Sequence, residues 1–197
     1  MGRKNNYKRI ARFAFFGAAG FGIGAIGFQG EPFGSWFMHL KGESIPWLPG
    51  FAILGAVGGV ALRLALGDWR RFWVSGFIGA LGFFLGTVIP IFLLIITLIG
   101  FRGDFSSTII FGAMPGAIGG AALGMNFGGW RASKGLALAG ALGFGLGMPI
   151  IFATPLDSWL GWVIWGIIGG TFLGVALGLL EKDIKGSMVP KKGKAIH

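Results

Sequence analysis

Residues 112–128 read GAMPGAIGGAALGMNFG, an apolar stretch with glycine at every fourth position from Gly112 to Gly128. Residues spaced by four lie on one slowly drifting stripe of an α-helix, where missing side chains let a second backbone approach closely. The stretch from Gly166 to Gly178 has the same spacing. Both stretches predict helices that pack closely inside a membrane, where helix association depends on contacts of this kind.

The chain matches itself around this stretch. When it is shifted by 61 positions, residues 55–86 align with residues 116–147 without a gap, and 16 of the 32 pairs are identical. The identical pairs include the Gly-x-Trp-Arg corners at 67–70 and 128–131. Glycine-rich membrane segments resemble one another by composition, but these paired corners favour an internal duplication.

A third copy is divided between the two ends of the chain. Residues 17–24 carry the pattern Gly-Ala-x-Gly-Phe-x-x-Gly of residues 79–86, and the glycines of 166–178 repeat those of 116–128 at an offset of 50. The simplest interpretation is three tandem glycine-rich two-helix hairpins, at about 10–67, 74–127 and 136–180.

Composition places these hairpins in a membrane. The 197 residues are 54% hydrophobic and only 12% charged, with a mean hydropathy of +0.76, which lies outside the range of soluble domains. A helix needs about 20 apolar residues to cross a bilayer. We therefore predict an all-α integral membrane protein with six transmembrane helices, at about 10–28, 50–67, 74–99, 109–127, 136–154 and 160–180.

The distribution of basic residues predicts the orientation. If the N-terminus is cytoplasmic, 15 of the 17 Lys and Arg residues lie on that side, and only Lys41 and Arg102 do not. The positive-inside rule then places both chain ends in the cytoplasm. The expected organisation is a basic N-terminus at 1–9, a membrane domain at 10–180 and a basic tail at 181–197. The compact chain and its short loops suggest a prokaryotic inner membrane.

The net charge of +10 indicates a partner of opposite sign. Because the cations gather at predicted cytoplasmic loops, the expected partner is the anionic headgroup layer of the bilayer, and not a nucleic acid. Cysteine is absent from the sequence, which excludes disulfides and thiolate metal sites.

The glycine stripes are the candidate functional residues. Three interpretations are open for them: helix packing within the chain, docking to a second copy or to other membrane subunits, and a pore lined by glycine backbone. The predicted helix-packing residues are Gly55, Gly59, Gly112, Gly116, Gly120, Gly124, Gly166, Gly170, Gly174 and Gly178.

One position departs from the stripe pattern. Arg63 stands where the other two copies have Gly124 and Gly174. Ionisable residues inside a span usually face the bundle or a wet cavity. Two alternatives are open for the side chain. It has a structural role, in which it reaches the headgroups or pairs with a neighbour such as Asp68, or it forms a binding site for an anion or lipid headgroup.

No span interior contains Asp, Glu, Lys or His, and no cluster of a nucleophile, a base or metal ligands can be named. We therefore expect neither enzymatic activity nor a cofactor or metal ion. The sequence favours a non-catalytic packing or assembly protein, either a subunit of a membrane complex or a homo-oligomer, that uses glycine-zipper helix faces. The alternative is a channel or passive transporter for a small solute, anion or lipid, with Arg63 near its cytoplasmic mouth.

Overall fold

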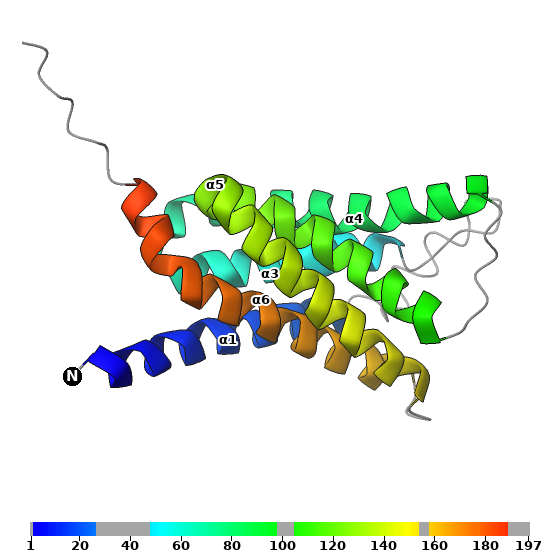
Figure 1. Ribbon diagram of the computed structural model, residues 1–197, viewed down its shortest axis with the longest axis horizontal. Coiled ribbons are helices and arrows are strands. Elements are labelled where there is room, and N and C mark those ends of the chain that lie inside the picture. Colours follow the sequence, from blue (N-terminus) through cyan, green and yellow to red (C-terminus); the bar gives the residue numbers. More distant parts are fainter. Residues whose placement is uncertain (1, 27–47, 98–104, 154–157, 189–197) are drawn as a thin grey trace, which may run out of the picture.

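The computed structural model describes residues 2–26, 48–97, 105–153 and 158–188, and within these ranges the chain is helical apart from the turn at 67–68 (Figure 1). Five of the helices are long and apolar enough to cross a membrane. The prediction of an all-helical chain suited to several membrane crossings is therefore confirmed. The elements are α1 (Gly2–Ile26), α3 (Leu48–Leu66), the 3-10 helix η1 (Trp69–Arg71), α4 (Phe72–Thr97), α5 (Phe105–Ala153) and α6 (Ser158–Met188).

The 49-residue helix α5 folds back on itself. Its helical geometry is broken at Gly128 (φ −156°, ψ 20°) and Gly129 (φ 71°, ψ −154°). A methyl group built on Gly116 would overlap the backbone of Gly140, and one built on Gly120 would overlap that of Leu136. The two halves therefore lie antiparallel and in close contact.

Gly129 holds a conformation that other residues avoid, since a positive φ with ψ near ±150–180° is essentially restricted to glycine. Nothing lies within 4 Å of a methyl group built there, so a substitution would add backbone strain without a clash. We expect Gly129→Ala to lower the free energy of unfolding by about 2 kcal/mol. Denaturant unfolding in mixed micelles measures this loss, and an unchanged midpoint would contradict the strained turn.

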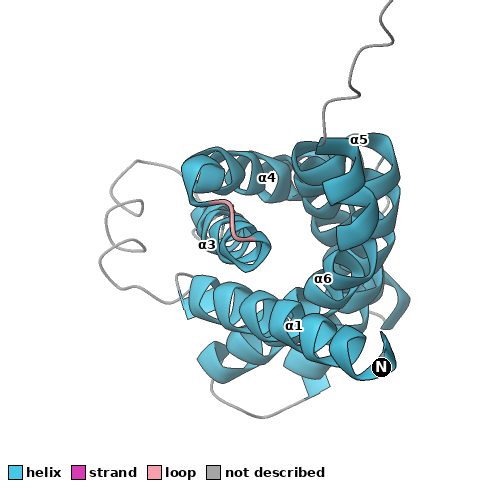
Figure 2. Cartoon of the chain, turned by 90° about the vertical axis from the view of Figure 1, so that its left-hand side faces the viewer, coloured by secondary structure: helices cyan, strands magenta, loops and turns pink. Residues whose placement is uncertain are grey.

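The helices form a closed ring. Along the chain, α1 packs on α3, α3 on α4, α4 on α5 and α5 on α6, and α6 then returns to pack on α1. The view along the long axis shows this circular arrangement (Figure 2). Because α1 and α6 are neighbours, the first and last helices complete the ring.

At one end of the long axis of the helix bundle lie the start of α1, the end of α6 and the two Gly-x-Trp-Arg corners at 67–70 and 128–131 (Figure 1). We call this end the basic end. Arg12 donates a hydrogen bond to the carbonyl oxygen of Ala65 at the end of α3. Arg9 forms an ion pair with Glu181 of α6, with 3.3 Å between Nε and Oε2. These contacts join three helices at the level where basic side chains are concentrated.

The terminal helices are longer than the predicted spans. The basic segment expected at 1–9 continues α1, which begins at Gly2, and α6 extends to Met188. Residues 189–197 of the predicted basic tail, together with Lys41 and Arg102, lie outside the described residues.

Candidate functional site

The predicted glycine stripes lie against backbone or side chains of neighbouring helices in the same chain. At three crossings two glycines face each other, so that a methyl group on either one would overlap the other's carbonyl oxygen. These pairs are Gly55 with Gly79, Gly116 with Gly140, and Gly17 with Gly170. The remaining stripe residues face Ser75 (Gly59), Phe144 and Met148 (Gly112), Leu136 (Gly120), Ser133 (Gly124), Phe21 (Gly166), Phe13 (Gly174), and Ile10 with Phe13 (Gly178).

These close approaches join α3 to α4, the two halves of α5, and α6 to α1. In the hairpins predicted at 10–67, 74–127 and 136–180, each predicted stripe lies on the second helix, and the sequence assigned no partner helix to it. The closest backbone contacts join the second helix of one predicted hairpin to the first helix of the next, and α6 of the last hairpin to α1 of the first. The tightest packing unit is therefore shifted by one helix from the unit that the sequence comparison defines.

Three phenylalanine rings fill the middle of the ring of helices. The ring centroids are 5.3 Å apart for Phe21 and Phe83, 5.5 Å for Phe21 and Phe144, and 5.2 Å for Phe83 and Phe144. All three side chains are completely buried. Tilted and edge-to-face rings at these separations pack favourably. We call this cluster the phenylalanine triad.

Each ring of the phenylalanine triad lies over a glycine of the next helix. A methyl group at Gly58 would overlap Phe21, one at Gly119 would overlap Phe83, and one at Gly169 would overlap Phe144. The sequence comparison aligned the three phenylalanines but assigned them no role. Their recurrence in the pattern Gly-Ala-x-Gly-Phe, beside a Gly-Gly pair on the other helix of each copy, is the signal from which this arrangement could have been predicted.

Arg63 lies inside the basic end, where it is 1% exposed. Its Nη2 donates to the Oδ2 of Asp68 at 2.5 Å, and its guanidinium carbon lies 5.7 Å from the ring centroid of Phe127. Asp68 also accepts a hydrogen bond from the backbone N–H of Arg70 and so caps η1. The guanidinium is thus buried between the helices, where it contacts a carboxylate and an aromatic face, and it does not extend to the surface.

Two further nitrogens of Arg63, Nε and Nη1, are buried without a hydrogen-bond partner. A buried donor without an acceptor lowers stability. The Asp68 carboxylate is therefore the principal compensation for placing this charge on the stripe that carries glycine in the other two copies.

Asp68→Asn is expected to lower the free energy of unfolding by about 2 kcal/mol. Removing one partner of a fully buried pair costs about 3–5 kcal/mol, and the 35% exposure of the Asp68 side chain reduces this figure. Adding Arg63→Met should restore stability, because the buried charge is then gone. Denaturant unfolding of both variants measures the effect, and equal stability of Asp68→Asn and the parent chain would contradict the pairing.

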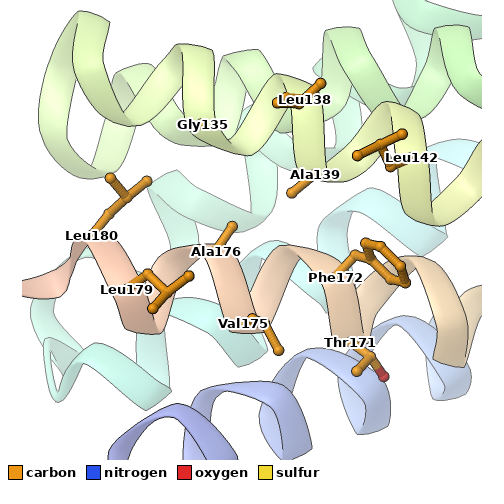
Figure 3. Close-up of a pocket in the computed structure, with 10 residues that line it drawn as sticks. All are labelled: Gly135, Leu138, Ala139, Leu142, Thr171, Phe172, Val175, Ala176, Leu179 and Leu180. Atoms are coloured by element: carbon orange, nitrogen blue, oxygen red, sulfur yellow. The ribbon is translucent and has the colours of Figure 1, made fainter. Parts of the chain in front are cut away.

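A groove of about 470 Å³ lies on the outer side of the ring, between the second half of α5 and α6 (Figure 3). Its walls are apolar. Small residues, Gly135, Ala139 and Ala176, line part of it, and larger side chains such as Leu138 and Leu179 line the rest. Thr171 also lines it, but its hydroxyl donates to the carbonyl oxygen of Ile167 in the same helix, at 2.7 Å. No pattern in the sequence indicated this groove.

Comparisons of the chain with protein-family models, with curated proteins and with solved structures find no match. The class of the protein therefore rests on its own residues. Long apolar helices, packed through glycine contacts around a phenylalanine core, define an all-helical protein whose helices suggest an integral membrane protein.

Proposed function

We propose that this chain is a non-catalytic, multi-pass packing or assembly protein of the membrane, acting as a subunit of a membrane complex or as a homo-oligomer. The observation that carries the proposal is the phenylalanine triad, whose three fully buried side chains occupy the centre of the helix bundle. A chain packed in this way acts as a compact block that presents its outer faces to lipid or to other subunits.

The proposed topology has six crossings, with both chain ends in the cytoplasm. The apolar part of α5 from Ile109 to Ile150 has 42 residues, about twice the number that a bilayer requires, and it turns back at Gly128 and Gly129. Each half then makes one crossing. The concentration of basic residues at one end of the ring supports a cytoplasmic position for that end.

Within this topology the chain has three equivalent copies, and its glycine zippers act within one molecule. Three crossings share the mutual glycine contact, and three share the phenylalanine-on-glycine contact. Contacts with other subunits would then use the outer faces. On α4 these carry large exposed side chains at every fourth position, among them Trp73, Phe77 and Leu81. The prokaryotic inner membrane remains our proposed location.

The mass of the particle in native lipid tests the assembly proposal. Membranes that contain the tagged protein are solubilised with a polymer that retains lipid, and the purified particles are analysed by native mass spectrometry. We expect a fixed stoichiometry of two or more polypeptides, in which each copy of this chain contributes 20.7 kDa. Particles that contain only one copy of this chain and no other protein would contradict the proposal.

The alternative, a passive transporter, is favoured by one observation: Nε and Nη1 of the buried Arg63 have no hydrogen-bond partner, as a side chain that binds a passing anion requires. Chloride flux into liposomes that contain the purified protein tests it. Flux equal to that of empty liposomes supports the packing protein, whereas flux that Arg63→Met abolishes would favour transport.

A further inference from the structure

We propose that the groove between the second half of α5 and α6 binds a phospholipid with an anionic headgroup, its acyl chain in the groove and its phosphate at the basic end. This inference rests on the proposed topology, which places the basic end at the cytoplasmic headgroup layer. The volume of about 470 Å³ lies within the range of small-molecule sites, about 300–1,000 Å³.

On the α5 wall of the groove, small residues occupy positions where the aligned copy has large ones. Gly135 and Ala139 line it, whereas the positions 61 residues earlier are Val74 and Ile78. The opposite wall includes Ala176 of α6. A branched side chain at Gly135 or Ala139 would reduce this space, so the small residues leave room there for an apolar ligand.

The walls suit a hydrocarbon chain. Leu138 is 63% exposed and Leu179 is 62% exposed, and they rise on opposite sides of the groove (Figure 3). The one hydroxyl among the lining residues, that of Thr171, is already bonded within its own helix. An acyl chain can therefore enter without leaving a polar group unsatisfied.

Cations stand at the basic end of the groove. Arg131 precedes Gly135 by four residues and Lys182 follows Leu179 by three, spacings that place each cation on the helix face that lines the groove. Both side chains are exposed, as is Lys134, whose Nζ lies 5.2 Å from the ring centroid of Trp130. Two helices thus contribute positive charge where the headgroup of a bound lipid would lie.

The same charges argue against a second copy as the occupant. In a membrane, two copies related by a two-fold axis would have their basic ends at the same level. Their Arg131 and Lys182 side chains would then face like charges across the contact. A phospholipid with an anionic headgroup satisfies the apolar walls and the cations together, since it carries both chemistries in one molecule.

Native mass spectrometry of the delipidated protein, titrated with lipid in mild detergent, tests this proposal. The probes are phosphatidylglycerol and phosphatidylcholine with identical acyl chains, so that only the headgroup charge differs. We expect one phosphatidylglycerol molecule to bind tightly and phosphatidylcholine to bind more weakly. Each cation near the headgroup should contribute about fivefold in affinity.

The double variant Arg131→Gln/Lys182→Gln should weaken phosphatidylglycerol binding about 25-fold. Arg70→Gln is the matched control, because Arg70 aligns with Arg131 in the copy where Val74 and Ile78 stand in place of the small residues. That control should bind lipid as the parent chain does. If the double variant loses no more affinity than Arg70→Gln, the cations do not form a headgroup site and the proposal is wrong.

Filling the groove tests the acyl chain separately. Ala176→Leu adds bulk to a partly exposed wall and should weaken binding of both lipids while the thermal unfolding temperature stays near that of the parent. Undiminished binding by this variant would overturn the proposal, as would a second protein chain bound in place of lipid. Because oligomeric state is read from particle mass, failure of the lipid site can be distinguished from failure of the assembly proposal.

Discussion

Replacing Phe144 by alanine is expected to lower the free energy of unfolding by about 3 kcal/mol. The side chain is completely buried and its ring contacts Phe21, Phe83 and Trp165. In soluble proteins such a change costs about 3–5 kcal/mol. The lower end applies here, because lipid or detergent solvates the apolar side chain in the unfolded state, so that the loss comes from the cavity and its missing packing contacts.

Phe77→Ala is the matched control, because this side chain is 66% exposed on the outer face of α4. It should change stability by less than about 1 kcal/mol. Both variants are compared by denaturant unfolding in the same mixed micelles, with helix content followed by circular dichroism. Equal losses in the two variants would mean that the phenylalanine triad does not form the core.

Gly140→Ala is expected to destabilise the protein by about 3 kcal/mol or more. The added methyl group would overlap the carbonyl group of Gly116, which is backbone and cannot move aside as a side chain does. Overpacking of a core costs about 1–3 kcal/mol and sometimes more, and a backbone obstacle places this variant at the upper end. The two halves of α5 would have to separate along their whole crossing.

Gly135→Ala in the same helix provides the comparison. A methyl group there would come within 2.7 Å of only the end of the Leu180 side chain, which can rotate. We expect it to retain the stability of the parent chain within about 0.5 kcal/mol. The same unfolding measurement checks both variants, and a Gly140→Ala protein as stable as Gly135→Ala would contradict the close backbone contact between Gly140 and Gly116.

Much of the architecture follows from the spacing of small residues. Periodicity and composition predicted helices suited to membrane crossings, because a stripe of glycines has one physical use that recurs, the close approach of a second backbone. The helix that each stripe packs against could not be predicted in the same way. Gly55 faces Gly79 on the following helix and Gly170 faces Gly17 at the other end of the chain. Pairings of this kind depend on how the ring closes, which no local pattern specifies.

The interior of the ring illustrates the same limit. The alignment brought Phe83 and Phe144 into one column, but a repeated phenylalanine fits a lipid-facing position as well as a central one. Burial decides between these positions, and burial is a property of the assembled ring. The groove beside Ala176 could not be predicted for a further reason, because it is lined by residues of two separate helices.

Arg63 shows where the sequence left alternatives open. Its place in the glycine column indicated that it faces other helices, and Asp68 was one of the partners considered. Burial of the side chain to 1% depends on Phe127 of α5, which is distant in sequence. The choice between a side chain that reaches the headgroups and one held inside therefore required the tertiary structure.

The most direct test of the closed, dry ring is the labelling of single cysteines by a membrane-impermeant maleimide in sealed vesicles of either orientation. The chain has no native cysteine to interfere. Thr87 is 2% exposed and Leu123 is completely buried, whereas Arg131 is exposed at the basic end. We predict that Arg131→Cys reacts from one face only and that Thr87→Cys and Leu123→Cys stay unlabelled until the protein is denatured. Labelling of both buried positions in native vesicles, graded from one face, would show water along the axis and contradict the proposed packing protein.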